Sequence, residues 1–179
     1  MAKDAKEEID VSRRRLLFGF LDRARGAEPA PVAVASNTAP LLAQANAAFG
    51  VRDFAAAATL YKEFLAEESA NGEARQRYGE CLYRQGQFIQ AKVEFERLLQ
   101  KNRKDNRAIL FLGLVLARLD RLRKAAVVWK LFFDPERVAL SRELNLQVGL
   151  VELAGDDDPL DGPAAALAVE RVLDTPRTV

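Results

Sequence analysis

The sequence has no histidine and a single cysteine, Cys81, among its 179 residues. Without histidine the chain lacks the commonest general base and metal ligand, and it has no Ser-His or Cys-His nucleophile. One cysteine cannot form an internal disulfide or a multi-cysteine metal site. The sequence therefore predicts a protein that is not an enzyme and that binds neither a cofactor nor a metal. The alternative is an enzyme that uses carboxylates such as Glu80, Glu94 or Glu143 for acid–base chemistry.

Long apolar runs and an excess of one charge are missing as well. Asp22 and Arg23, or Arg118 and Asp120, interrupt the longest apolar segments, so none reaches the roughly 18 to 20 residues of a transmembrane helix. The 27 basic residues balance 26 acidic ones, which leaves a formal net charge of +1. This balance argues against nucleic acid as a partner. We expect a cytoplasmic protein without a small-molecule substrate.

The first 40 residues divide into three parts by composition. Residues 1–11 are charged and have few large apolar groups, which predicts a mobile tail. Ser12 can cap a short basic amphipathic helix over residues 12–25. Residues 26–40 hold three prolines in a background of small residues, which predicts an extended linker.

The amphipathic segment 12–25 is a candidate docking element. An apolar face beside a basic cluster can bind a second protein or a membrane-associated complex, the chain's own groove, or a membrane interface. The arginines followed by an apolar stretch are also similar to a twin-arginine export signal, although Asp22 and Arg23 shorten that stretch. The candidate docking residues are Arg13, Arg14, Arg15, Leu17, Phe18, Phe20 and Leu21.

The middle of the chain repeats every 34 residues, as in the step from Phe54 to Phe88. Size classes recur in this register: Phe54, Phe88 and Leu122 are large, Ala57, Ala91 and Ala125 are small, Tyr61, Phe95 and Trp129 are aromatic, and Ala45, Gly79 and Gly113 are small. Small residues permit two helices to approach closely, while large ones fill the grooves beside the contact. The pattern predicts three helix–turn–helix units over residues 41–137, with turns at 51–53, 85–87 and 119–121 and a left-handed Gly86.

This pattern resembles the tetratricopeptide repeat (TPR) over about residues 38–137. The resemblance implies an all-α fold, a right-handed superhelical stack of helix pairs (an α-solenoid), whose concave groove is lined by the first helix of each unit. The family's helix-terminating proline is absent from the aligned positions, where Ser69, Arg103 and Arg137 stand. Residues 138–174 extend the stack as a degenerate fourth unit with a capping helix, for which Pro163 is a favourable start.

The resemblance further implies a protein-binding role as an adaptor, scaffold or assembly subunit, with a partner's peptide or helix in the groove. The mixture of apolar and basic side chains favours an amphipathic or acidic partner. Members of the family that bind a partner's terminal carboxylate use a set of polar and basic residues, which Asn46, Arg77 and Arg107 match only in part. Leu110 and Leu114 have an alternative role, which is packing within the stack. The predicted groove residues are Asn46, Phe49, Gln76, Arg77, Glu80, Tyr83, Arg84, Arg107, Leu110, Leu114 and Arg118.

Overall fold

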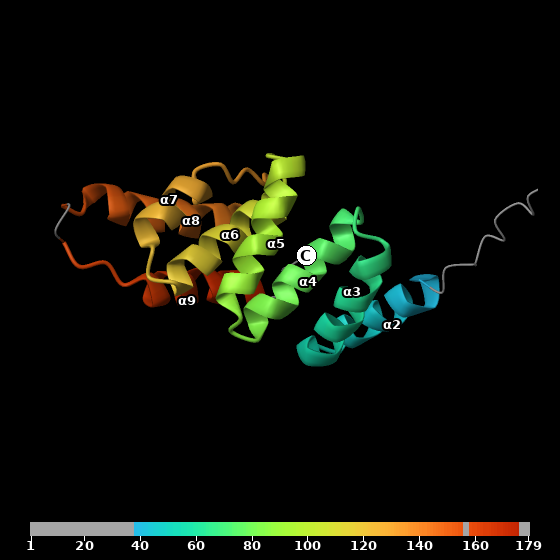
Figure 1. Cartoon of the computed structure of the whole chain (residues 1–179). Coiled ribbons are helices and arrows are strands. Elements are labelled where there is room, and N and C mark those ends of the chain that lie inside the picture. Colours follow the sequence, from blue (N-terminus) through green and yellow to red (C-terminus); the bar gives the residue numbers. More distant parts are fainter. Residues whose placement is uncertain (1–37, 156–157, 176–179) are drawn as a thin grey trace, which may run out of the picture. The chain divides into compact units, whose positions relative to one another are not determined.

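The computed structural model describes residues 38–155 and 158–175, and within them the chain is entirely helical, as Figure 1 shows. The predicted tail, the amphipathic segment and most of the linker lie outside these residues. The helices are α2 (Thr38–Gly50), α3 (Phe54–Glu67), α4 (Gly72–Arg84), α5 (Phe88–Lys101), α6 (Asn106–Arg118), α7 (Leu122–Trp129), α8 (Val138–Leu153) and α9 (Gly162–Asp174). The predicted all-α fold is confirmed, and none of the described helices is long and apolar enough to span a membrane.

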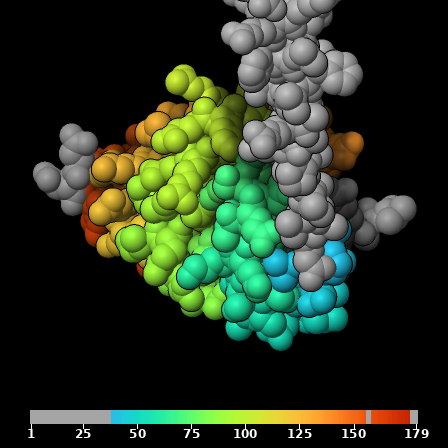
Figure 2. Space-filling view, turned by 45° about the vertical axis from the view of Figure 1, so that its right-hand side comes forward, coloured from blue at the N-terminus to red at the C-terminus, as the bar shows by residue number. Residues whose placement is uncertain are grey.

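The first six helices form three antiparallel pairs that pack in chain order, α2 with α3, α4 with α5 and α6 with α7. Each second helix also packs against the first helix of the next unit, so that α3 contacts α4 and α5 contacts α6. In the space-filling view the first unit (blue and teal) and the second unit (green) meet in a continuous surface (Figure 2). The first six described helices therefore form three helix–turn–helix pairs.

The turn inside each unit has the same backbone conformation at the same repeat position. Gly86 has a positive φ of 74°, as the sequence predicts, but Arg52 and Asp120 have φ values of 64° and 57° although neither is glycine. A residue with a Cβ is strained in this left-handed region. The geometry of the helix pair therefore imposes the turn even where the local sequence does not favour it.

Side-chain caps define where four of the eight described helices begin. The carboxylate or amide oxygens of Asp53, Asn71, Asp105 and Asp161 accept hydrogen bonds from the backbone N–H three residues later, at 2.8 to 3.0 Å. Such caps satisfy one of the N–H groups that a helix start leaves without an intrahelical partner. Asp161 thus caps the start of α9.

Close contacts between the paired helices explain the repeated small residues. A Cβ at Gly79 would lie 2.9 Å from the Phe95 ring, and a Cβ at Gly113 would overlap the Trp129 indole even more closely. Ala45 and Tyr61, in the same register of the first unit, are both fully buried. Each unit therefore places one aromatic ring against a small residue of its first helix.

Two boundaries differ from the sequence prediction. Helix α2 begins at Thr38, so the last three residues of the predicted linker are helical, and Pro40 fits because the N–H groups of the first turn need no intrahelical partner. Helix α7 has 8 residues whereas α3 and α5 have 14 each. Residues 130–137, including Pro135, form an irregular connection to α8.

Helices α8 and α9 follow the three pairs, but α9 does not take the place of a helix that closes the end of the stack. It packs against α6 as well as α8 (Figure 1). Its first residue, Gly162, lies against the Ala117 backbone at the end of α6. The outer side of α8 stays uncovered, and Leu146, Leu150 and Leu153 are exposed there. The chain therefore folds its last helix back toward the first helices of earlier units.

Candidate functional site

The eleven predicted groove residues all lie on α2, α4 and α6, the first helices of the three units. These helices are direct neighbours, α2 beside α4 and α4 beside α6. We call their common surface the first-helix face. The structure divides ten of the predicted residues into three groups: an open part, a part in contact with α9, and two residues in the core. The eleventh, Glu80, is buried and pairs with Arg107.

The open part of the first-helix face consists of Asn46, Phe49, Gln76, Arg77 and Arg107, none of which is buried. Arg77 donates to Asn46 Oδ1 at 2.7 Å, and its guanidinium carbon lies 5.8 Å from the centre of the Phe49 ring. The Gln76 amide donates to Asp105 Oδ1 at 3.0 Å. Planar, polar and aromatic groups therefore lie together on a surface that water reaches.

The cations of this open part have carboxylate partners. Arg77 also forms an ion pair with Glu73 at 2.6 Å, and Arg107 pairs with the buried Glu80. A partner's carboxylate at Asn46, Arg77 and Arg107, the positions that partly match a carboxylate clamp, would compete with these internal bonds. The side chains of Arg77 and Arg107 remain 32% and 41% exposed, so both can still donate outward.

The second part of the face is covered by α9. Arg84 donates two hydrogen bonds to the Asp174 carboxylate, at 2.8 and 2.6 Å. Arg118 binds both oxygens of Glu170, and the Tyr83 hydroxyl donates to the same carboxylate. Forked arginine–carboxylate bonds of this kind are directional as well as strong. The predicted groove residues Tyr83, Arg84 and Arg118 thus bind a helix, and that helix belongs to the same chain.

Burial and charge shift the ionisation of these groups. Burial raises the pKa of the Tyr83 phenol well above its ordinary value, and the hydrogen bond to Glu170 acts in the same direction. Hydrogen bonding to Arg84 lowers the pKa of Asp174, and hydrogen bonding to Asp174 raises the pKa of Arg84. The contact between α4 and the end of α9 is therefore an ion pair at neutral pH.

Leu110 and Leu114 do not contribute to any surface. Leu110 is 2% exposed and Leu114 is fully buried, and both belong to the main hydrophobic core. Their alternative role, packing within the stack, is the one the structure shows. The reason is that α6 is almost entirely apolar between Ala108 and Ala117 and is surrounded by α5, α7 and α9.

Sequence reasoning missed the acidic side of the covered contact. Glu170 lies 87 residues from Tyr83 and 52 from Arg118, so no local spacing relates them. The one available signal is that Glu170 and Asp174 are four residues apart, which places two carboxylates on one side of a helix. Tyr83 is further anchored by edge-on contact with Phe111, at 5.6 Å between ring centres.

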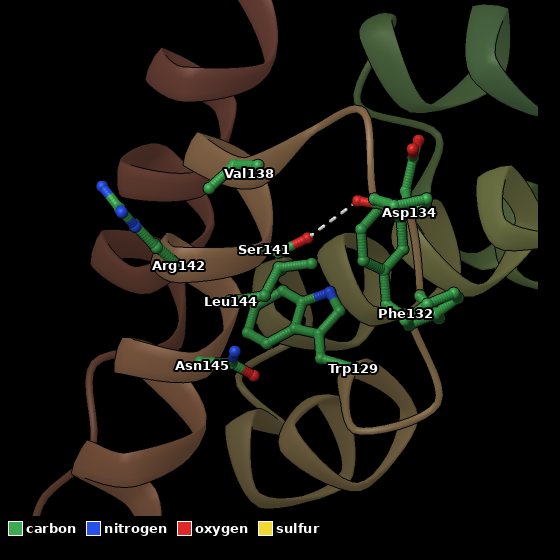
Figure 3. Close-up of a pocket in the computed structure, with 10 residues that line it drawn as sticks. Trp129, Phe132, Asp134, Val138, Ser141, Arg142, Leu144 and Asn145 are labelled. Carbon is green, nitrogen blue, oxygen red and sulfur yellow. Dashed lines mark hydrogen bonds between the residues drawn. The ribbon is translucent and has the colours of Figure 1, made fainter.

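A separate pocket of about 380 Å³ lies between α7 and α8, where the early end of α7 leaves space (Figure 3). Trp129, Phe132 and Leu144 form much of its wall. The Ser141 hydroxyl donates to the Asp134 carbonyl at 3.3 Å, and Arg142 extends away from Trp129 in Figure 3. The pocket is therefore lined by polar as well as apolar groups, and one of the polar groups, the Ser141 hydroxyl, bonds to the loop between α7 and α8.

The carboxylates considered for acid–base chemistry have partners. Glu80 pairs with Arg107, Glu94 pairs with Arg75 and with Arg97, and Glu143 accepts a hydrogen bond from Gln147 at 2.8 Å. Within the described residues, no cluster of three or more acidic or cysteine side chains is arranged to hold a metal ion. The contacts of Glu80 and Glu94 are those of structural ion pairs, and the contact of Glu143 is a hydrogen bond within α8.

Comparison with known proteins agrees with this architecture. Residues 48–115 match the sequence profile of the tetratricopeptide-repeat family. This segment consists of tetratricopeptide repeats. Outside it, α2 and α7 continue the same register, and a search of curated proteins found no significant match to the chain.

Two solved structures share the TPR-like fold. The Yersinia enterocolitica type III secretion translocator chaperone SycD is 16% identical, with 65% of this chain and 92% of that chain covered and a TM-score of 0.58. The MamA RS-1 ArsTM double mutant is 23% identical, with 98% of this chain and 99% of that chain covered and a TM-score of 0.58. At these identities the likeness establishes the fold alone.

Proposed function

We propose that this TPR protein is an adaptor, scaffold or assembly subunit that holds a partner's peptide or helix on its first-helix face. The observation that supports this most directly is that part of the face already binds a helix, α9, through Tyr83, Arg84 and Arg118. The neighbouring part is open and carries the same kinds of side chain. Extended faces of stacked helix pairs are suited to such binding.

The open part supplies contacts typical of protein interfaces. Arg77 stacked on Phe49 is an arginine–aromatic combination that is enriched where binding energy concentrates. Gln76 and Asn46 add amide groups that can bond a partner's backbone. A segment with acidic and apolar side chains complements this surface, because the cations Arg77 and Arg107 remain partly exposed to solvent.

A non-catalytic role is part of the proposal. Glu80 and Glu94 are held by arginines, and each carboxylate helps to connect two helices, Glu80 of α4 with α6 and Glu94 of α5 with α4. A protein chaperone among the structures of the same fold is consistent with binding rather than catalysis. We further propose that residues 12–25 attach the protein to a second protein or to a membrane-associated complex, on the strength of their sequence pattern.

The test is a quantitative comparison of proteins that co-purify with the tagged full-length chain. An Arg77→Ala/Arg107→Ala variant should lose partners that the first-helix face holds. A Lys62→Ala/Lys101→Ala variant is the matched control, because it removes two exposed cations from the second helices of units one and two. Circular dichroism checks that both variants remain folded.

A deletion of residues 12–25 completes the series and should lose a different set of partners. The adaptor proposal fails if the same proteins co-purify in equal amounts with all four forms of the chain. Loss of partners from the lysine control alone would instead indicate that the binding surface lies on the second helices.

A further inference from the structure

We infer that the part of the first-helix face under α9 is a binding site for a second helix in trans, and that α9 is its built-in competitor. The partner is an amphipathic helix with a face of small apolar side chains and two carboxylates four residues apart. This inference rests on the proposed function in one respect only, that the first-helix face binds protein.

The chemistry of the site follows from what α9 presents to it. Two carboxylates, Glu170 and Asp174, are separated by one helical turn, and each is bound by an arginine of a different helix, Arg118 of α6 and Arg84 of α4. The distance between the two arginine sites thus measures one turn of a bound helix. A helix with neutral residues at these two positions would leave both arginines without their carboxylates.

The most deeply buried apolar side chains of α9 are small. They are Ala165, Ala166 and Val169, which are at most 5% exposed, whereas the larger Val172 and Leu173 pack against the same core but are only partly buried. Alanine and valine bury far less apolar area than leucine or phenylalanine, and stabilisation scales with that area. The ion pairs with Arg84 and Arg118 therefore add to an apolar contact made mainly by small side chains, and a helix with the same pattern can replace α9.

α9 also leaves the site incompletely satisfied. The Nε atom of Arg84 is buried and has no hydrogen-bond partner among the described residues. A buried donor without a partner costs free energy that another ligand could recover. A partner helix with an additional acceptor near the Asp174 position would satisfy this atom, which gives it an advantage over α9.

Competition in cis sets the behaviour of the site. A helix tethered to its own site acts at an effective concentration in the millimolar range, so a free helix of equal intrinsic affinity binds the intact chain weakly. Weakening the ion pairs of α9 lowers this competition without altering Arg84 or Arg118. The site then accepts the free helix more readily.

The experiment uses the full-length chain and a fluorescent synthetic peptide with the sequence of residues 159–175. Fluorescence anisotropy measures its affinity for the wild type and for an E170Q/D174N variant, in which α9 has lost both carboxylates. We expect the variant to bind the peptide about 10-fold or more tightly than the wild type, because two charge-assisted contacts of the competitor are gone. An Arg171→Gln variant is the control, since Arg171 is exposed on the same helix, and it should behave like the wild type.

A second variant releases α9 by a different route. Ala166 is fully buried against the stack, so Ala166→Lys should unseat the helix without touching either carboxylate, and should also strengthen peptide binding. A peptide with glutamine and asparagine in place of its two carboxylates should bind both variants at least about 10-fold more weakly. Hydrogen exchange of residues 162–174 reports whether α9 is loosened in each variant.

Three outcomes would overturn the inference. They are equal peptide affinity for wild type and E170Q/D174N, equal affinity of the charged and neutral peptides, and unchanged hydrogen exchange of α9 in both variants. An Arg77→Ala/Arg107→Ala variant should leave peptide affinity unchanged, because these residues lie in the open part. Failure of the peptide assay together with partner loss in that variant would reject the α9 site and retain the proposed function.

Discussion

Gly113 offers the sharpest test of how the TPR pairs are packed. A methyl group at this position would overlap the Trp129 indole, which is 2% exposed and donates to the Leu110 carbonyl at 3.3 Å. Because Trp129 is enclosed, Gly113→Ala should cost about 3 kcal/mol of overpacking, the upper end of the usual range. Alanine recovers about 1 kcal/mol of helix propensity, which leaves a net loss of about 2 kcal/mol.

Urea unfolding followed by circular dichroism measures this loss. Gly149→Ala is the matched control, because Gly149 is also inside a helix, α8, but a Cβ there meets nothing within 4 Å. The control should be stabilised by about 0.5 to 1 kcal/mol, so the same chemical change should have opposite signs at the two sites.

A double variant identifies the cause. Phe95 occupies the place of Trp129 in the second unit and accommodates Gly79 with a less severe approach. Combining Gly113→Ala with Trp129→Phe should therefore destabilise the protein less than the sum of the two single changes. Additive losses, or a Gly113→Ala variant as stable as the wild type, would refute the packing argument.

Three further predictions concern single residues. Arg52→Gly should stabilise the protein by about 0.5 kcal/mol, because glycine adopts the positive φ at this position without strain. Gly86→Ala at the same repeat position should destabilise it by about 1 kcal/mol. Urea unfolding measures both changes in the free energy of unfolding, and changes of the same sign would contradict the turn argument. Burial raises the pKa of the Cys81 thiol to about 12, so Ellman's reagent should modify it only in denaturant, and rapid native modification would contradict its burial. Arg84 lowers the pKa of Asp174, so this pair stabilises α9 above the unfolded-state pKa of 3.8 and the stabilisation is lost as pH falls through the lower folded-state pKa. Amide hydrogen exchange in α9, measured at pH values on either side of 3.8, should be faster at the lower pH. Asp174→Asn should remove the part of this pH dependence that the Arg84–Asp174 pair contributes.

The sequence by itself determined the repeating architecture, because its 34-residue period encodes contacts within each unit. Gly79 and Gly113 are small because a helix partner approaches them, and Phe95 and Trp129 are large because they fill that contact. These pairs are 16 residues apart, so one unit contains all the information they need. The same locality explains why the turn at Gly86 could be predicted.

Only the tertiary structure decided which part of the first-helix face is free. The bonds from Tyr83, Arg84 and Arg118 to Glu170 and Asp174 span 52 to 90 residues, and no periodicity connects groups that far apart. Folding α9 back onto α6 instead of onto the end of the stack brings these charges together. The physical reason is that repeats encode contacts between neighbours, whereas a helix that leaves the repeat pattern is placed by complementary charge and shape alone.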